Sequence, residues 1–297
     1  MNSIERALQK QKASEQNKTP PLQNPIVNEV TESESPVKNS LEQQAKLSKG
    51  NNVASSIEID FALLENKGFV STNSQRQLIN EEYRAIKRKL LDNAFGPLSK
   101  SLSNSNIIMV TSSRPGEGKT FTAINLALSI ALEKDKTVLL VDADVLRPNV
   151  MKTLGLKDEH GLMEYLLGET VNISEVMYKT NLDNLRIIPA GKSHHLSTEL
   201  LASERMFLAV EEFANRYTDR VVIVDTPPLL GINETAILAN LAGQAVVVTE
   251  ESKTKLIDIE QAVKQLNPRM AIGFIMNKSE KVNSDKTGYG YYYAGSD

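Results

Sequence analysis

The chain has 297 residues and a mass of 32.8 kDa, a length that accommodates about two domains at ~150 residues each. Its 34 basic and 37 acidic side chains give a net charge of −3, which excludes a strongly basic nucleic-acid-binding protein and a polyacidic tail protein. The absence of cysteine excludes disulfides, thiolate nucleophiles and cysteine zinc sites. No apolar run reaches the ~18 residues of a membrane span, and the first residues lack the apolar core of a secretory signal, so we expect a cytoplasmic protein.

The first 55 residues divide into two segments. Ile4, Ala7 and Leu8 have helical spacing, which predicts a short amphipathic helix within residues 1–12. This segment is either a fraying terminus or a docking helix for a membrane or a partner protein. Residues 13–55 are rich in Gln, Asn, Ser, Lys and Glu, with prolines at 20, 21, 25 and 36 and no aromatic residue. Such a composition cannot bury enough apolar surface to offset its ordering entropy, so it predicts a disordered linker.

The rest of the chain alternates between helical patterns and short apolar runs. Helices are predicted over 76–93, 119–133, 199–217 and 255–267. The apolar runs lack clean alternation, as buried parallel strands do; they are Ile107–Thr111, Thr137–Val141, Leu185–Pro189, Val221–Val224, Ala245–Thr249 and Ile272–Met276. This order predicts an α/β domain over residues 56–282, with a mostly parallel β-sheet and helices on both faces.

A phosphate-binding loop follows the first of these strands. The stretch Gly116-Glu117-Gly118-Lys119-Thr120 opens a helix directly after a strand, which is the context of a P-loop. Two glycines let the backbone amides approach phosphate oxygens at the helix N-terminus. The lysine is expected to reach the β- and γ-phosphates of ATP, and the threonine hydroxyl to hold Mg²⁺. The predicted ATP-binding residues here are Ser113, Arg114, Pro115, Gly116, Glu117, Gly118, Lys119, Thr120 and Phe121.

Carboxylates follow two further strands. The second strand ends in Asp142-Ala-Asp144, and the fourth in Asp225, which two prolines follow. The carboxyl ends of parallel strands meet at one sheet edge, so we expect these side chains near the phosphates. There they can hold Mg²⁺ or accept a proton from a nucleophile. The predicted metal ligands are Thr120, Asp142, Asp144 and Asp225, and the predicted catalytic residues are Lys119, Asp142, Asp144 and Arg147.

In this order and at these spacings, the three motifs resemble those of the bacterial tyrosine kinases of polysaccharide loci. That family has a P-loop of this type, an apolar strand followed by D-x-D as at Asp142 and Asp144, and an apolar strand followed by D-x-P-P as at Asp225. It belongs to the deviant P-loop group that also contains the MinD and ParA ATPases. The stretches IERAL, EEYRAIKRKLL and TELLASERM look most like the exosortase-associated tyrosine autokinases of exopolysaccharide loci. The resemblance covers residues 78–297 well and the first dozen weakly.

The end of the chain carries a tyrosine cluster. Residues 283–297 contain GYGYYYAG and are expected to form a flexible tail. The resemblance implies that this tail is the autophosphorylation substrate, entering the active site of a neighbouring subunit; an aromatic interaction tail is the alternative. The implied phosphate acceptors, four of the eight tyrosines in the chain, are Tyr289, Tyr291, Tyr292 and Tyr293.

Three further positions take their meaning from the resemblance. The family builds a ring with an E-x-x-R-x-x-R motif on a helix, which implies oligomerisation through Glu81, Arg84, Lys87 and Arg88. Lys87 stands at the last Arg position, and the alternative is an ordinary solvated charged helix. Asn277 follows the last strand, where related ATPases recognise adenine; a turn-forming Asn is the alternative. Arg114 stands at the place of the MinD and ParA signature lysine, where it either contacts a phosphate or is solvated.

Together these features predict an ATP-dependent protein-tyrosine autokinase that requires ATP and Mg²⁺. Asp142 is the candidate base for the tyrosine hydroxyl, with Mg²⁺ coordination as its alternative role. The resemblance implies a homo-oligomer, a separate membrane adaptor of the polysaccharide copolymerase type, a cognate tyrosine phosphatase, and peripheral association with the inner membrane. It also implies a role in exopolysaccharide chain length, polymerisation or export, with no nucleic-acid partner. The alternatives are a MinD/ParA-like ATPase switch and a non-catalytic scaffold. The intact P-loop and aspartates disfavour the scaffold.

Overall fold

The computed structural model describes residues 56–71 and 77–279. By its internal contacts the chain divides into two units, Met1–Asn51 and Asn52–Asp297, and all of the described residues belong to the second unit. The predicted helix over 1–12, the predicted linker over 13–55 and the predicted tail over 283–297 lie outside the described residues. They stay predictions.

A single β-sheet forms the centre of the described residues. Its strands are β1 (Ser56–Ile57), β2 (Ile107–Ser112), β3 (Thr137–Asp142), β4 (Tyr178–Thr180), β5 (Leu185–Ile188), β6 (Arg220–Asp225), β7 (Gln244–Glu250) and β8 (Ala271–Asn277). Their order across the sheet is β1-β4-β5-β3-β6-β2-β7-β8. All neighbouring pairs are parallel except β4 and β5, which are antiparallel. The mostly parallel sheet that the sequence predicts is therefore confirmed.

The six predicted strands are all present, within two residues at either end. Every residue of β2 and β6 is buried, because both strands lie inside the sheet and helices cover their two faces. The sequence analysis missed β1 and β4, which have 2 and 3 residues. Strands this short contain too few residues to show a hydrophobic period.

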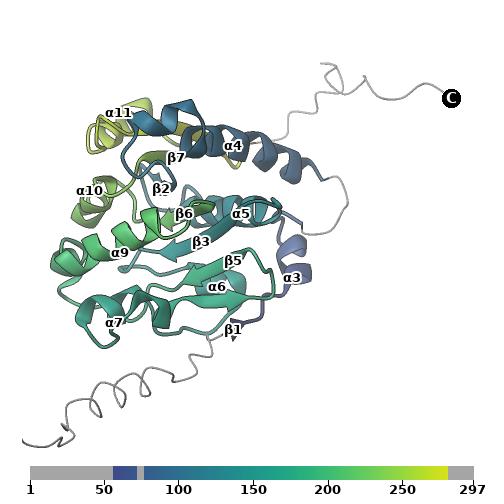
Figure 1. Ribbon diagram of the computed structural model, residues 1–297. Coiled ribbons are helices and arrows are strands. Elements are labelled where there is room, and N and C mark those ends of the chain that lie inside the picture. The colour runs from purple at the N-terminus through teal and green to yellow at the C-terminus, as the bar shows by residue number, and fades with distance from the viewer. Residues whose placement is uncertain (1–55, 72–76, 280–297) are drawn as a thin grey trace, which may run out of the picture. The chain divides into compact units, whose positions relative to one another are not determined.

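Helices cover both faces of the sheet (Figure 1). The α-helices are α3 (Phe61–Asn66), α4 (Leu78–Phe95), α5 (Lys119–Ala131), α6 (Val150–Leu154), α7 (Leu162–Leu167), α8 (Ser197–Leu201), α9 (Glu204–Asn215), α10 (Asn233–Ala239) and α11 (Leu256–Val263), and two 3₁₀-helices span Pro97–Ser101 and Ile173–Val176. One apolar cluster joins α3, α4, α5 and α6 to one face, and a second joins α7, α9, α10 and α11 to the other. Within the described ranges, no helix is both long and apolar enough to cross a bilayer.

Three of the four predicted helices are confirmed as α4, α5 and α11. The prediction of one helix over 199–217 is wrong, because α8 ends at Leu201 and α9 begins at Glu204. The hydroxyl of Ser203 accepts a hydrogen bond from the backbone amide of Met206, and such a cap favours the start of a new helix. The apolar spacing continues across this break, so periodicity alone did not reveal it.

Candidate functional site

The topology brings the predicted motifs together at one edge of the sheet. β3, β6 and β2 are neighbours in the sheet and run parallel, so their carboxyl ends meet. Asp142 ends β3, Asp225 ends β6, and the P-loop continues from β2 into α5. Ligands of open parallel sheets bind at this edge. A cleft of about 900 Å³ opens there, and among the residues that line it are Lys119, Thr120, Phe121, Asp144, Arg147 and Lys152.

The P-loop has the backbone conformation that phosphate binding requires. Gly116 and Gly118 have φ angles of +88° and +100°, in the left-handed region that favours glycine. A Cβ atom on Gly118 would lie 1.9 Å from Nδ2 of Asn277, whereas one on Gly116 would have no neighbour within 4 Å. Gly118 therefore allows both the backbone conformation and the close approach of β8. Gly116 serves the backbone conformation alone.

Two pairs of side chains in the site are connected by an ion pair and a hydrogen bond. Lys119 Nζ lies 2.5 Å from Asp144 Oδ2, and Thr120 Oγ1 donates to Asp225 Oδ2 at 2.7 Å. Burial lowers the pKa of Lys119, but the carboxylates of Asp225 and Asp144 outweigh this effect and raise the pKa above its usual value. The ammonium group therefore stays charged over the whole physiological range and can neutralise phosphate charge.

Asp142 is placed differently from the other two aspartates. Its side chain is fully buried, and its Oδ1 accepts a hydrogen bond from the backbone amide of Asp144 at 3.1 Å. Its Oδ2 accepts from the amides of Asn149 and Val150 at 3.1 and 3.0 Å. Burial raises the pKa of Asp142, and the charge of Asp225 adds to the effect, against the opposing backbone hydrogen bonds. Asp142 thus fixes the turn between β3 and α6, while Asp144 is the one that lines the cleft.

The donors around Thr120 fit Mg²⁺ bound together with a nucleotide. The second oxygen of the Asp225 carboxylate, Oδ1, is buried without a hydrogen-bond partner, and such a buried orphan acceptor is costly unless a cation or water satisfies it. Burial raises the pKa of Asp225 despite the opposing charge of Lys119. Among the described residues no group of three or more His, Asp or Glu side chains could hold a metal by itself.

Side chains from the end of β8 and from the segment before α11 form hydrogen bonds with the P-loop. Asn277 Nδ2 donates to the Glu117 carbonyl at 3.0 Å, and Lys278 Nζ donates to the Gly116 carbonyl at 2.7 Å. The Glu117 carboxylate is buried and accepts hydrogen bonds from the Arg114 amide at 2.9 Å and from the Thr254 hydroxyl at 2.5 Å. Residues from β8 and from the segment before α11 therefore hold the loop in shape.

The predicted nucleotide contacts at Arg114 and Asn277 have protein partners in this structure. The Arg114 guanidinium forms two bonds with the Asp258 carboxylate of α11, at 2.8 and 2.9 Å. This contact raises the pKa of Arg114 and lowers that of Asp258. The Asn277 amide nitrogen binds the P-loop, as described above. Ser113 is fully buried and its hydroxyl has no partner. Sequence reasoning missed Thr254 and Asp258, because only the fold places α11 beside the loop.

The predicted oligomerisation residues do not share one environment. Glu81 and Arg84 form an exposed ion pair at 2.6 Å, and Arg88 is exposed. Lys87 is 6% exposed, and its Nζ donates to the Ser129 carbonyl at 2.7 Å and pairs with Glu133 at 2.6 Å. Lys87 therefore joins α4 to α5 within one subunit. Glu81, Arg84 and Arg88 remain on the surface.

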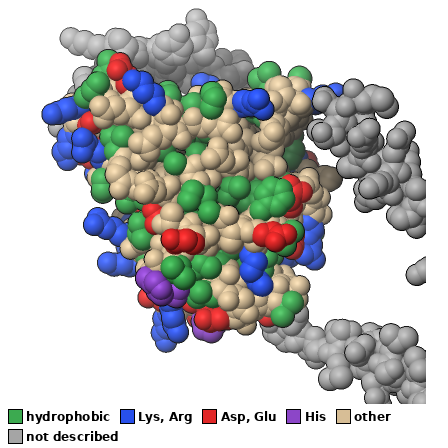
Figure 2. Space-filling model, turned by 90° about the vertical axis from the view of Figure 1, so that its left-hand side faces the viewer, with side chains coloured by type: hydrophobic (Ala, Val, Ile, Leu, Met, Phe, Trp, Pro, Cys, Tyr) green, Lys and Arg blue, Asp and Glu red, His purple; other side chains and the backbone are tan. Residues whose placement is uncertain are grey.

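Charges of both signs are mixed on one face of the molecule. Figure 2 shows acidic, basic and hydrophobic side chains interspersed there, with histidine side chains at its lower part. The rings of His194 and His195 lie 4.2 Å apart, yet no metal-binding group forms around them within the described residues. The predicted Tyr289, Tyr291, Tyr292 and Tyr293 lie outside the described residues.

Comparisons with known proteins identify the family. Residues 105–272 match a family model described as an AAA domain. EpsB of Ralstonia nicotianae is 33% identical over 192 residues, which make up 64% of this chain and 25% of EpsB, so the chain spans about a quarter of that protein's length. The tyrosine-protein kinase YwqD of Bacillus subtilis is 31% identical over 239 residues, 78% of this chain and 96% of YwqD.

A solved structure agrees with the sequence relatives. The kinase domain of the Escherichia coli tyrosine kinase ETK matches with a TM-score of 0.61 and 26% identity, over 88% of this chain and 100% of that chain. The P-loop, the two aspartate motifs and their common sheet edge are thus found in a chain whose relatives are tyrosine-protein kinases. The chain belongs to the bacterial tyrosine-protein kinase family and carries its AAA-type P-loop domain.

Proposed function

We propose that this chain is an ATP-dependent protein-tyrosine kinase that phosphorylates tyrosines of its own C-terminal cluster within a homo-oligomer. The observation that carries the proposal is that four side chains meet at one cleft. Lys119 forms an ion pair with Asp144 at 2.5 Å, and Thr120 forms a hydrogen bond with Asp225 at 2.7 Å. Lys119 pairs with Asp144 and lines the same cleft, where its ammonium group can neutralise phosphate charge.

A carboxylate is required where the tyrosine hydroxyl enters. An ordinary tyrosine has a pKa of about 10, so a nearby base must assist attack at neutral pH. We place this role on Asp144, which lines the cleft and accepts one backbone hydrogen bond, from the Arg147 amide at 3.1 Å. Both oxygens of Asp142 are held by backbone amides. The tyrosine oxygen then forms a bond to the γ-phosphorus, the bond to the ADP oxygen breaks, and the hydroxyl proton passes to Asp144.

Mg²⁺ would supply positive charge that stabilises the transferring phosphoryl group. Thr120 and Asp225 are the residues that would hold it. Phosphoryl transfer depends mainly on positioning and charge stabilisation, so the bracing of the P-loop by Glu117 and Asn277 also contributes. The resemblance to the kinases of exopolysaccharide loci supports a role in polysaccharide polymerisation or export. The same resemblance is the basis for proposing a separate membrane adaptor, a cognate phosphatase and a place at the inner membrane surface.

The experiment is mass spectrometry of the purified chain after incubation with Mg-ATP. We expect phosphate on tyrosines within 289–293 in the wild type and in Lys134→Met, a control at an exposed lysine. We expect none in Lys119→Met, or in a variant with all four tail tyrosines changed to Phe. Steady ADP release without phosphotyrosine, unchanged by the Phe substitutions, would refute the kinase and favour an ATPase switch of the MinD/ParA kind. The same samples are measured with a candidate adaptor added.

A further inference from the structure

Among the described residues, β8 has an apolar edge with no neighbouring strand. It is the last strand in the sheet order and pairs with β7 along one side only. Its sequence, AIGFIMN, contains neither charge nor proline, and Phe274 and Met276 are 54% and 65% exposed. Natural sheets protect their edges with charges, prolines, bulges or a covering segment. None of the first three is present on β8, which points to a covering segment.

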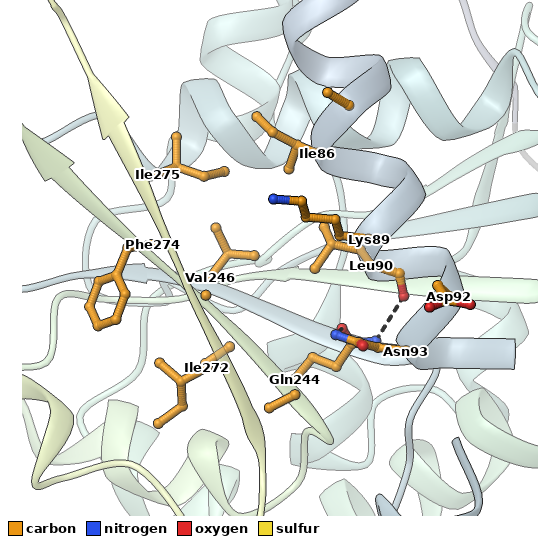
Figure 3. A pocket seen from close by; sticks show the side chains of 14 residues that line it. Ile86, Lys89, Leu90, Asp92, Asn93, Gln244, Val246, Ile272, Phe274 and Ile275 are labelled. Carbon is orange, nitrogen blue, oxygen red and sulfur yellow. Dashed lines mark hydrogen bonds between the residues drawn. The ribbon is translucent and has the colours of Figure 1, made fainter. Parts of the chain in front are cut away.

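The two faces of this edge differ in shape. Ile272, Phe274 and Met276 alternate along one face, and Phe274 points away from α4 (Figure 3). On the other face Ile275 points toward α4, and a cavity of about 460 Å³ lies between the two elements. Ile86 of α4 contributes to its apolar wall. Gly273 leaves this side of the strand open, because a Cβ there would meet only the Ala245 carbonyl, at 4.0 Å.

The tyrosine-rich end of this chain matches that edge in position and in pattern. It follows β8 directly, since β8 ends at Asn277. Residues 280–297 span about 60 Å when extended at ~3.3 Å per residue, whereas a strand of the length of β8 spans about 23 Å. The tail can therefore turn and run back along β8. Tyr289, Tyr291 and Tyr293 recur at every second position, with Gly290 and Tyr292 between them, which is the period of a strand.

We propose that this tail docks in cis on β8 as an added antiparallel strand. In the register that aligns the patterns, Tyr289, Tyr291 and Tyr293 lie opposite Met276, Phe274 and Ile272. Aromatic side chains opposite apolar ones stabilise antiparallel pairs. Tyr292 then lies opposite Gly273 and faces the cavity beside α4. Backbone hydrogen bonds to the free edge supply affinity, as in other cases of strand addition to a sheet.

Sequence position favours this occupant over two others. The turn needed in this register is Lys278–Thr287, and closing a loop of this length costs little compared with a longer one. Residues 1–55 instead precede β1 in the chain, and β1 is the strand at the opposite end of the order. A second copy of the chain would have to associate from solution. The consequence for catalysis rests on the proposed function: a docked tail withholds its tyrosines from the active site. Phosphate on Tyr289, Tyr291 or Tyr293 opposes docking, because the β8 residues opposite them are uncharged, whereas Tyr292 faces the cavity that Lys89 also lines.

The test is disulfide formation between introduced cysteines in the full chain, without ATP. The chain has no cysteine of its own, so each double variant contains a single possible pair. Phe274→Cys is combined in turn with cysteine at 289, 290, 291, 292 and 293. Gly273→Cys, on the opposite face, is the matched control and is combined with the same five positions. Mild oxidation is followed by non-reducing gel electrophoresis and by mass spectrometry of the linked peptides.

Side-chain alternation makes the result decisive. We expect Phe274→Cys to form intramolecular disulfides with 289, 291 or 293 about tenfold faster than with 290 or 292, because only residues on the same face bring their Cβ atoms within bonding range. Gly273→Cys must show the reverse preference. Equal rates at all five positions would show a tethered but undocked tail and would overturn the proposal. Predominantly intermolecular disulfides would assign the edge to a second copy, and absence of any disulfide would exclude tail docking. The disulfide pattern is measured without ATP and does not depend on kinase activity. A chain that shows this pattern but no kinase activity would support tail docking and refute the proposed function.

Discussion

Replacing Gly118 by alanine tests how the P-loop is held. The residue has a φ angle of +100°, and a Cβ atom there would lie 1.9 Å from Nδ2 of Asn277. That amide donates to the Glu117 carbonyl at 3.0 Å. Gly118→Ala therefore imposes a left-handed conformation on an L-residue and also displaces the side chain that connects β8 to the loop. Gly116→Ala is the matched control, because its φ is +88° but its Cβ would meet nothing within 4 Å.

The magnitude follows from these two contributions. A left-handed conformation costs an L-residue roughly 1–2 kcal/mol, and this cost applies to both variants. Loss of the hydrogen bond from Asn277 adds about 0.5–1.5 kcal/mol and applies to Gly118→Ala alone. We expect the free energy of unfolding to fall by about 1–2 kcal/mol for Gly116→Ala and by about 1.5–3.5 kcal/mol for Gly118→Ala. For a domain of this size the second value corresponds to a decrease in Tm of roughly 3–14 °C.

The assay is urea unfolding of the nucleotide-free protein, in the wild-type and Asn277→Ala backgrounds. Without the Asn277 amide there is no side chain for the new Cβ to displace, so the two alanine variants should become equally destabilised. This double-mutant cycle isolates the contact, since the sites are neighbours and are expected to couple. Should Gly118→Ala stay more destabilised than Gly116→Ala in the Asn277→Ala background, the clash with Asn277 would not be its cause. Nucleotide affinity, measured on the same variants, should fall most for Gly118→Ala.

Three more predictions concern charged residues. Lys87→Ala should lower the free energy of unfolding by about 1–3 kcal/mol, because it leaves the Ser129 carbonyl unsatisfied. Arg88→Ala should change this free energy by less than about 0.5 kcal/mol and should alter only the oligomeric mass measured by light scattering. A larger loss of stability for Arg88→Ala than for Lys87→Ala would contradict the placement of Lys87. Asp144→Asn should retain Mg-ATP binding by calorimetry but slow tyrosine phosphorylation by about 10²-fold or more, and an unchanged rate would remove Asp144 as the base. Burial raises the pKa of Asp225, so the folded Mg-free protein holds this proton more tightly than the unfolded chain. Its stability should therefore fall as pH rises from the ordinary carboxylate range through the raised pKa; urea unfolding at a series of pH values should show a shallower decline for Asp225→Asn.

The predictable part of the site is the part that is local in sequence. The P-loop could be located because a strand, a glycine-rich turn and a helix follow one another without interruption. Asp144 and Asp225 could be assigned to the same edge because parallel strands all end there. Neither inference required the order of strands, and the structure places both aspartates at hydrogen-bonding distance from P-loop side chains.

The parts that sequence reasoning missed depend on which elements become neighbours. Arg114 and Asp258 lie 144 residues apart, and nothing in either segment indicates that α11 packs beside the P-loop. The distinction between Lys87 and Arg88 depends on a rotation of about 100° around α4, which a charged helix does not reveal by itself. Asp142 and Asp144 look equivalent in D-x-D, and both are buried. The following turn nevertheless holds Asp142 through backbone hydrogen bonds and directs Asp144 to the cleft.

One strand end connects the two proposals physically. Asn277 is the last residue of β8 and donates to the P-loop carbonyl of Glu117, and the next residue, Lys278, donates to Gly116. Lys278 has a φ angle of +55° and also contacts Glu250 at the end of β7. The backbone therefore changes direction at the point where β8 meets the nucleotide loop and where the tyrosine-rich segment begins. Any displacement of the Glu117 and Gly116 carbonyls would act on these same two residues, because both donate to them. Differential contacts of this kind are what energetic coupling between a nucleotide site and a docked segment requires.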